Sequence, residues 1–179
     1  GLNAIVAVPK DLLLPWYAPV NDFRDPLLFT LAGSPAAVDV RGPGRESYTV
    51  QQQTNGAWRI LPQGWPADAG LVKYVLTTLG SLPIAEFTKD VVIAPDLPAY
   101  GLAAPLRQFV LRSAPGNAAE VASNSVIVEV DFGTNQADKV YARRADESFV
   151  YAVKLADFQR AVQAYLLAIP AVNQAAMRK

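Results

Sequence analysis

The feature that most constrains the fold is a β-hairpin pattern over residues 46–62. Side chains alternate in "ESYTVQQQ" (46–53) and again in "AWRILP" (57–62), as they do on a strand with one buried face. The linker ends in Asn55-Gly56, a favoured hairpin turn because both residues tolerate positive φ. A chain with such a hairpin builds at least part of its core on an antiparallel sheet.

Two amphipathic helices are predicted beside this hairpin. Residues 67–82 carry apolar residues at three- and four-residue spacing, and Asp68 is a candidate N-cap. Residues 155–169 repeat that spacing. A chain crossing between a helix and a strand also needs corners, and "YGLAAP" (100–105), at the end of a Pro-rich stretch from 94, is suited to one.

The order of elements predicts an α+β fold with a mainly antiparallel sheet, one central amphipathic helix and a C-terminal helix. Residues 138–153 form a second predicted hairpin. A doubly wound parallel sheet is not indicated, because helices and strands do not alternate regularly. The remaining β-type runs are 3–8, 36–40, 85–93, 107–113, 119–123 and 125–132, with "FGTNQAD" (132–138) as a turn.

The N-terminal region echoes the C-terminal one. "AIVAVPK" (4–10) aligns with "SFVYAVK" (148–154) at an offset of 144, and the same offset pairs Pro26 with Pro170. Residues 11–33 are apolar but interrupted by prolines, which favours short helical turns. An internal repeat predicts that 1–33 is the tail of a preceding repeat (strand plus short helices) and 34–179 one complete repeat. Chance similarity is the alternative, because three identities carry the alignment.

Composition excludes several chemistries. The chain has no Cys and no His, so thiolate nucleophiles, Cys-ligated metals and Ser–His–Asp machinery cannot be built from it. Sixteen acidic residues balance sixteen basic ones, which gives no basic field for nucleic acid. No apolar run is long enough to span a bilayer. We therefore expect no enzyme activity, no cofactor and no metal.

Acidic and glycine-containing motifs leave a few candidates. The closest groupings of carboxylates that could do acid–base work are Asp22/Asp25, Glu129/Asp131 and Asp146/Glu147. Glu129 and Asp131 would share one face of a strand, where mutual repulsion can raise a pKa; a solvent-facing strand edge is the favoured alternative. "DFGTNQAD" (131–138) is a faint calcium candidate. Its "DFG" is not a kinase motif, because the accompanying motifs are missing, and "GPG" (42–44) lacks the context of a phosphate loop.

Aromatic residues admit two interpretations. Trp16, Tyr17, Trp58 and Trp65 could form a sugar- or peptide-binding patch, but packing in the core and turns is favoured. "YGLAAP", which begins at Tyr100, could be a binding turn or a folding corner, and the corner is favoured. If a ligand site exists, we expect it near Trp65 and Tyr100.

From Tyr48 to Pro170 the sequence resembles the bacterial domain-of-unknown-function family 4340. The segments that carry the resemblance are "NGAWRILP", "PAD" before a helix, "YGLAAP" before a strand, "VEVDFG" and "KVYARRADESFVYAVK". The family pattern falls on Trp58, Pro62, Ala67, Asp68, Tyr100, Gly101, Leu102, Pro105, Gly133, Tyr141, Ala142, Arg143, Val150, Tyr151 and Val153.

The resemblance implies tandem copies behind an N-terminal membrane anchor and an association with ABC-type transport or gliding-motility components. It supplies no catalytic residues. We therefore expect a non-enzymatic extracytoplasmic (periplasmic or cell-surface) domain that contacts protein partners in the cell envelope. The alternative is a domain that binds a small ligand or glycan through surface aromatics.

Overall fold

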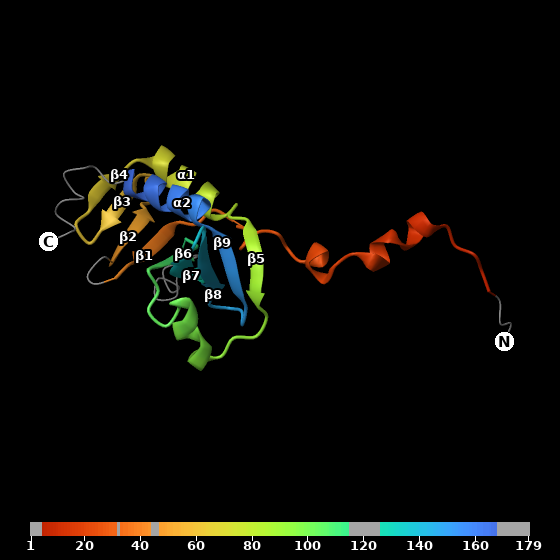
Figure 1. Ribbon diagram of the computed structural model, residues 1–179. Helices are drawn as coiled ribbons and strands as arrows, with labels where there is room; N and C mark the ends of the chain where they lie inside the picture. The colour runs from red at the N-terminus through yellow and green to blue at the C-terminus, as the bar shows by residue number, and fades with distance from the viewer. Residues whose placement is uncertain (1–4, 32, 44–46, 115–125, 168–179) are drawn as a thin grey trace.

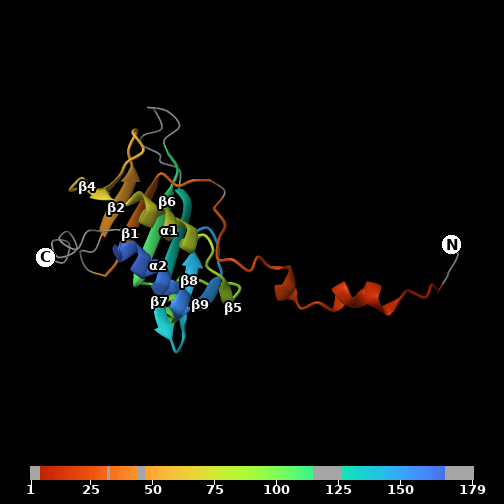
Figure 2. The ribbon, with the colours of Figure 1, turned by 90° about the horizontal axis from the view of Figure 1, so that it is seen from above.

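A computed structural model describes residues 5–31, 33–43, 47–114 and 126–167. In these residues a strongly twisted nine-stranded sheet carries two α-helices on one face, and an N-terminal segment runs away from the domain (Figures 1 and 2). The elements are η1 (Lys10–Tyr17), η2 (Val20–Phe23), β1 (Ala37–Arg41), β2 (Ser47–Gln52), β3 (Trp58–Leu61), β4 (Trp65–Ala67), α1 (Ala69–Leu79), β5 (Ile84–Lys89), η3 (Ala94–Tyr100), β6 (Arg107–Arg112), β7 (Val126–Gln136), β8 (Lys139–Arg144), β9 (Val150–Lys154) and α2 (Leu155–Leu167), where η denotes a 3₁₀-helix.

The strand order is β4-β3-β2-β1-β6-β7-β8-β9-β5, and every neighbouring pair is antiparallel. The α+β prediction is therefore confirmed. Both predicted hairpins are present, as β2–β3 and β8–β9. Strand β5 follows α1 in the chain but joins the sheet at its far edge, beside β9.

The first hairpin has a different turn from the one predicted. Among its turn residues only Gly56 has a positive φ, +81°. The Gly56 amide donates to the Gln53 carbonyl (2.9 Å) and the Gln53 amide to the Ala57 carbonyl (2.8 Å), which closes a three-residue loop over Thr54, Asn55 and Gly56. The Asn55 side chain accepts a hydrogen bond from the Ala57 amide (3.1 Å) and so holds the loop without a left-handed backbone.

The central helix forms as predicted. The Asp68 carboxylate accepts a hydrogen bond from the Leu71 amide (2.8 Å) and caps α1. The buried side chains of α1, Val72, Val75 and Leu79, face the sheet. Helix α2 starts directly after β9, and the last residues of the predicted helix, from 168 on, lie outside the described residues, as does the predicted strand 119–123.

The core lies between the helices and one face of the sheet. Along β7 this face carries Val128, Val130 and Phe132, all buried. The Phe132 ring lies 5.9 Å from that of Phe109 and 4.8 Å from that of Phe158 on α2, measured between centroids. Trp58, predicted to be core, is 9% exposed and packs in the same cluster.

The opposite face of the sheet is polar over its middle strands and covered by η3 at one end. A second apolar cluster of Val92, Leu102 and Val150, with Tyr100 and Tyr141 against it, fixes η3 to that end. This side of the sheet therefore has its own small core.

Two local expectations are wrong, and one strand was not predicted. Strand β7 continues through Gln136, where a turn had been predicted, and a register shift between Phe132 and Asn135 absorbs the irregularity. Strand β4 was not predicted; it contains Pro66, which a strand tolerates at a sheet edge, and β4 lies at an edge. The strand expected over 3–8 is absent from residues 5–8, which do not pair with the sheet.

The predicted boundary at residue 33 runs through a packed unit. The Leu28 amide donates to the Leu82 carbonyl (2.8 Å) and the Ile84 amide to the Pro26 carbonyl (2.7 Å). Leu28 and Phe29 are buried in the main core. The compact domain thus begins near residue 24, while the repeat itself stays a prediction.

The residues before it, 5–23, form an exposed arm (Figure 2). Short 3₁₀ turns replace a long helix there, as the prolines predict. Of these residues only Ala18 is even partly buried, and Trp16 and Tyr17 are 84% and 77% exposed, so the predicted packing of these two aromatics is wrong. Ten large apolar side chains of the arm are exposed: Ile5, Val6, Val8, Leu12, Leu13, Leu14, Trp16, Tyr17, Val20 and Phe23.

Candidate functional site

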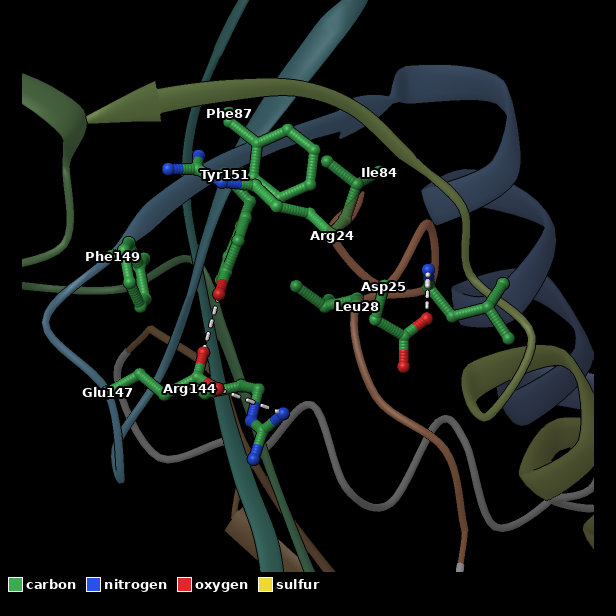
Figure 3. Close-up of a pocket in the computed structure, with 10 residues that line it drawn as sticks. Arg24, Asp25, Leu28, Ile84, Phe87, Arg144, Glu147, Phe149 and Tyr151 are labelled. Carbon is green, nitrogen blue, oxygen red and sulfur yellow. Dashed lines mark hydrogen bonds and ion pairs between the residues drawn. The ribbon is translucent and has the colours of Figure 1, made fainter. Parts of the chain in front are cut away.

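A cleft of about 190 Å³ opens where the arm joins the domain (Figure 3). Three segments distant in sequence form it: residues 24–28, strand β5, and the β8–β9 turn with the start of β9. The side chains that line it are Arg24, Asp25, Leu27, Leu28, Ile84, Phe87, Arg144, Glu147, Phe149 and Tyr151. Aromatic and aliphatic walls with a few charged groups are typical of binding sites for small groups.

Three aromatic rings form one side of the cleft. The Tyr151 ring stands edge-on to Phe87 at 5.8 Å and lies 6.0 Å from Phe149, between centroids. The Arg24 guanidinium lies over Phe87, 4.7 Å from its centroid, and 5.9 Å from that of Phe149. Its two terminal nitrogens donate to the Asp90 carboxylate at 2.8 and 2.9 Å. The protein therefore already holds one planar cation between two of these rings.

A chain of polar groups forms the floor. The Tyr151 hydroxyl donates to Glu147 (2.5 Å), and the other Glu147 oxygen pairs with Arg144 (3.2 Å). Arg144 also donates to Asp146 through two nitrogens, at 3.0 and 2.5 Å. Burial, and then the bond to Glu147, raise the pKa of the Tyr151 phenol well above its ordinary value of 10. The phenol therefore remains a hydrogen-bond donor to Glu147 at any physiological pH.

Asp25 stands at the mouth, where Figure 3 places its carboxylate across the cleft from Glu147 and Tyr151. One of its oxygens accepts a hydrogen bond from the Leu27 amide (2.9 Å). A carboxylate has about four acceptor positions, so most of the Asp25 capacity is directed to solvent or to a ligand.

The predicted carboxylate pair lies elsewhere, on the polar face of the sheet. Glu129 and Asp131 do share a face of β7, but β7 is a central strand, so the expected strand-edge position is wrong. The Gln108 amide nitrogen donates to Glu129 (2.9 Å) and to Asp131 (2.7 Å) and thereby bridges them. Partial burial raises the pKa of Asp131, against the opposing effects of Gln108 and nearby arginines. With its bridging amide and neighbouring arginines, the pair has the character of a structural network.

Trp65 and Tyr100, the predicted ligand surface, do not come together. Trp65 is half-buried on β4, at one edge of the sheet, and packs against the main core. Tyr100 ends η3 on the opposite face and stands edge-on to Tyr141 of β8, with centroids 5.0 Å apart. Five strands lie between β4 and β8 in the sheet order, so no single ligand contact joins the two residues.

The "YGLAAP" segment is a corner fitted against β7. Gly101 has a φ of +67° and Leu102 is buried, while Pro105 leads into β6. A Cβ on Gly133 would lie 2.1 Å from the Tyr100 carbonyl oxygen, and one on Gly101 would lie 2.6 Å from the Thr134 nitrogen. The two backbones touch only because both positions are glycine. The corner is therefore required for packing, whereas a binding role for it stays a prediction.

Within the described part of the chain, no three Cys, His, Asp or Glu side chains gather around a common point that could hold a metal ion. Residues 131–138, the faint calcium candidate, form the end of β7 and its turn into β8. None of the helices that the structure describes has the length and hydropathy of a membrane span.

Sequence reasoning missed the cleft. Arg24, Phe87 and Glu147 belong to three segments about 60 residues apart, and no spacing pattern links them. Of the lining residues, Tyr151 had been noted as part of the family pattern, and Asp25 and Glu147 only as members of two separate carboxylate groupings, Asp22/Asp25 and Asp146/Glu147. The nearest signal in the sequence was the lone arginine after a proline-rich apolar segment, which does not by itself indicate a site.

Comparison with known proteins gives one match. The family described as a domain of unknown function, DUF4340, matches residues 58–165, which is 108 of the 179 residues (165 − 58 + 1). No curated protein and no solved structure matches the chain. Because the match covers more than half of the chain and includes Trp58, Asp68, the corner at Gly101 and the β8–β9 hairpin, this chain belongs to the DUF4340 family.

Proposed function

We propose that this protein is a non-enzymatic protein-interaction domain of the cell envelope, and that the arm of residues 5–23 is the element that binds the partner. The exposure of the arm carries the proposal: ten large apolar side chains face solvent over nineteen residues. Contiguous exposed apolar surface on this scale is typical of a segment that is covered by another molecule.

A protein partner fits the arm better than a membrane. Prolines at positions 9, 15 and 19 prevent a continuous helix, so the arm has no extended amphipathic face to lay on a bilayer. Its charged residues are one lysine and two aspartates, whereas interfacial helices carry several basic residues. An extended, proline-interrupted apolar segment suits a groove or a sheet edge on a protein.

Site-specific crosslinking tests this. A photo-reactive amino acid at Trp16 should give a discrete protein adduct in cells of the source organism. The adduct should be lost when Leu12 and Leu14 are both changed to Ser, and retained in a matched control with Tyr74→Ser, which alters an exposed aromatic of α1 away from the arm. Adducts with lipid alone, or a protein adduct unaffected by the Ser changes, would contradict the proposal.

The extracytoplasmic location is part of the proposal and rests on the family resemblance. Because the chain has no Cys, Thr54→Cys in the exposed hairpin loop creates a single reactive thiol. A maleimide that cannot cross the inner membrane should label this thiol in cells whose outer envelope has been opened. Labelling only after lysis of the inner membrane would place the domain in the cytoplasm instead.

The alternative function, binding of a small ligand, is favoured by a different observation from the one first considered. Trp65 and Tyr100 are far apart, but the cleft beside Tyr151 combines aromatic walls with charged groups. A thermal-shift screen with sugars, peptides and nucleotides tests the alternative, since a ligand that binds the folded state raises the melting temperature.

A further inference from the structure

We propose that the cleft between residues 24–28, strand β5 and the β8–β9 turn binds a cation carried on an aliphatic stem, such as an alkylammonium or alkylguanidinium group. The inference does not depend on the arm or its partner. It rests on the charges of the cleft, on the arrangement of its aromatic rings and on its size.

The charges of the cleft favour a cation. Both arginines that line it are already paired, Arg24 with Asp90 and Arg144 with Asp146 and Glu147. The four charged residues that line the cleft are Arg24, Arg144, Asp25 and Glu147, and of these Asp25 is the one whose charge is not matched by a described ion pair. The Asp25 carboxylate accepts a hydrogen bond from the Leu27 amide and keeps further acceptor positions for a ligand. An incoming carboxylate or phosphate would meet arginines whose charges are already neutralised by ion pairs, and it would be repelled by Asp25.

The rings show how a cation is held here. The Arg24 guanidinium lies between Phe87 and Phe149, 4.7 and 5.9 Å from their centroids, and within the roughly 6 Å over which ring faces attract cations. Tyr151 stands between these two phenylalanines, and Leu28 and Ile84 continue the wall toward the mouth (Figure 3). A second cation at the mouth can pair with Asp25 while its aliphatic stem covers this apolar wall.

The size of the cleft limits the ligand. At about 190 Å³ it is smaller than the roughly 300–1,000 Å³ of pockets for drug-sized molecules, so it suits one short chain and its head group. A Lys or Arg side chain of a peptide and a free alkylamine share this chemistry. The experiment below separates these two sources.

Chemical-shift titration of the ¹⁵N-labelled protein tests the proposal. We expect n-butylammonium and N-butylguanidinium to bind with dissociation constants of about 1–10 mM, as for other ligands of this size, and to shift amides in β5 and in residues 147–151. Butyrate, whose alkyl stem is one carbon shorter, carries the opposite charge and should give no saturable shifts there. Equal or tighter binding of butyrate, or cation-induced shifts confined to other regions, would overturn the proposal.

Two variants locate the cation. Asp25→Asn keeps an acceptor for the Leu27 amide but removes the charge, and should weaken butylammonium binding about fivefold. Asp22→Asn, three residues away and outside the cleft, is the matched control and should leave the affinity unchanged. An Asp25→Asn protein that binds as tightly as the wild type would refute the role of this carboxylate.

Arg24→Ala provides an independent readout. It vacates the space between Phe87 and Phe149, so ethylguanidinium should raise the melting temperature of the variant more than that of the wild type. An equal rise in both proteins would count against recognition by the rings. The peptide acetyl-Gly-Lys-Gly-amide distinguishes the two sources of the cation. If it binds more tightly than butylammonium, the ligand is a peptide side chain. If it does not bind while butylammonium does, the ligand is a free amine.

Discussion

The contact between the corner at Gly101 and strand β7 gives the sharpest prediction. Gly133→Ala would place a Cβ 2.1 Å from the Tyr100 carbonyl oxygen, at least 0.9 Å (3.0 − 2.1) closer than real Cβ atoms approach other heavy atoms. The corner cannot easily withdraw. The Gly101 amide donates to the Pro98 carbonyl (3.1 Å), the Leu102 amide donates to the Leu97 carbonyl (2.9 Å), and the Tyr100 ring packs on Tyr141.

The magnitude follows from this rigidity. Overpacking a well-packed site costs roughly 1–3 kcal/mol, and we expect Gly133→Ala to reach about 3 kcal/mol because the obstacle is backbone. For a domain of this size that lowers the melting temperature by about 6–12 °C. Gly101→Ala should cost at least as much, since it adds a left-handed φ of +67° to a 2.5 Å approach to the Thr134 methyl carbon.

Two further glycines separate the two causes. Gly56→Ala meets nothing within 4 Å but keeps a φ of +81°, so it carries strain alone, about 1–2 kcal/mol. Gly33→Ala has neither problem and should be neutral or slightly stabilising. Because both corner variants disrupt one contact, the double variant Gly101→Ala/Gly133→Ala should cost less than the sum of the singles.

Urea and thermal unfolding, followed by circular dichroism, measure the series. Gly33→Ala should be the most stable variant, Gly56→Ala should follow, and Gly133→Ala and Gly101→Ala should be the least stable. If the free energies of unfolding of Gly133→Ala and Gly33→Ala differ by less than about 1 kcal/mol, the corner does not pack against β7 as described. A corner variant that keeps its stability but loses ligand binding would instead support the interpretation of "YGLAAP" as a binding turn.

Three more predictions concern single side chains, each measured by equilibrium unfolding. Asp68→Ala should cost about 1 kcal/mol by removing the cap of α1, whereas Asp68→Asn should cost almost nothing. Leu14→Ser in the arm should change stability by less than about 0.5 kcal/mol, whereas Leu28→Ala in the core should cost about 2–5 kcal/mol; equal losses would mean that the arm packs on the domain. Asp131→Asn should stabilise the protein at pH 7, because the raised pKa of Asp131 means that its ionised form is disfavoured in the fold. That gain should vanish as the pH falls below 3.8, where the carboxyl is protonated in both states, and a gain that persists there would contradict the reasoning.

Local signals predicted most of the fold. The alternation around Asn55-Gly56, the helical spacing after Asp68 and the glycine at the corner each act over a few residues, and each appears in the structure. What sequence could not supply was the position of β5. Its residues read as extended, but nothing local states that they pair with β9 instead of a strand nearer in the chain.

That pairing creates the cleft, which explains why the candidate site escaped prediction while the fold did not. Phe87 of β5 meets Tyr151 of β9 only across this antiparallel pair, and residues 24–28 close the cleft by bridging to the start of β5. Sequence reasoning favoured Trp65 and Tyr100 because of their residue type, which carries no information about their position in the fold. They serve opposite faces of the sheet.

The folding unit is larger than the family match, and the sheet order shows why. The match begins at Trp58, within the first hairpin, so it omits β1 and β2. Yet β1 lies between β2 and β6 in the middle of the sheet, and Val38 faces the same core as Phe109 of β6. Without β1 and β2, the β3–β4 pair loses its only strand connection to β6 in the described sheet, and the β6 edge is left open. Residues 24–29, β1 and β2 are therefore integral to the folded domain that holds Gly101 against β7 and contains the cleft.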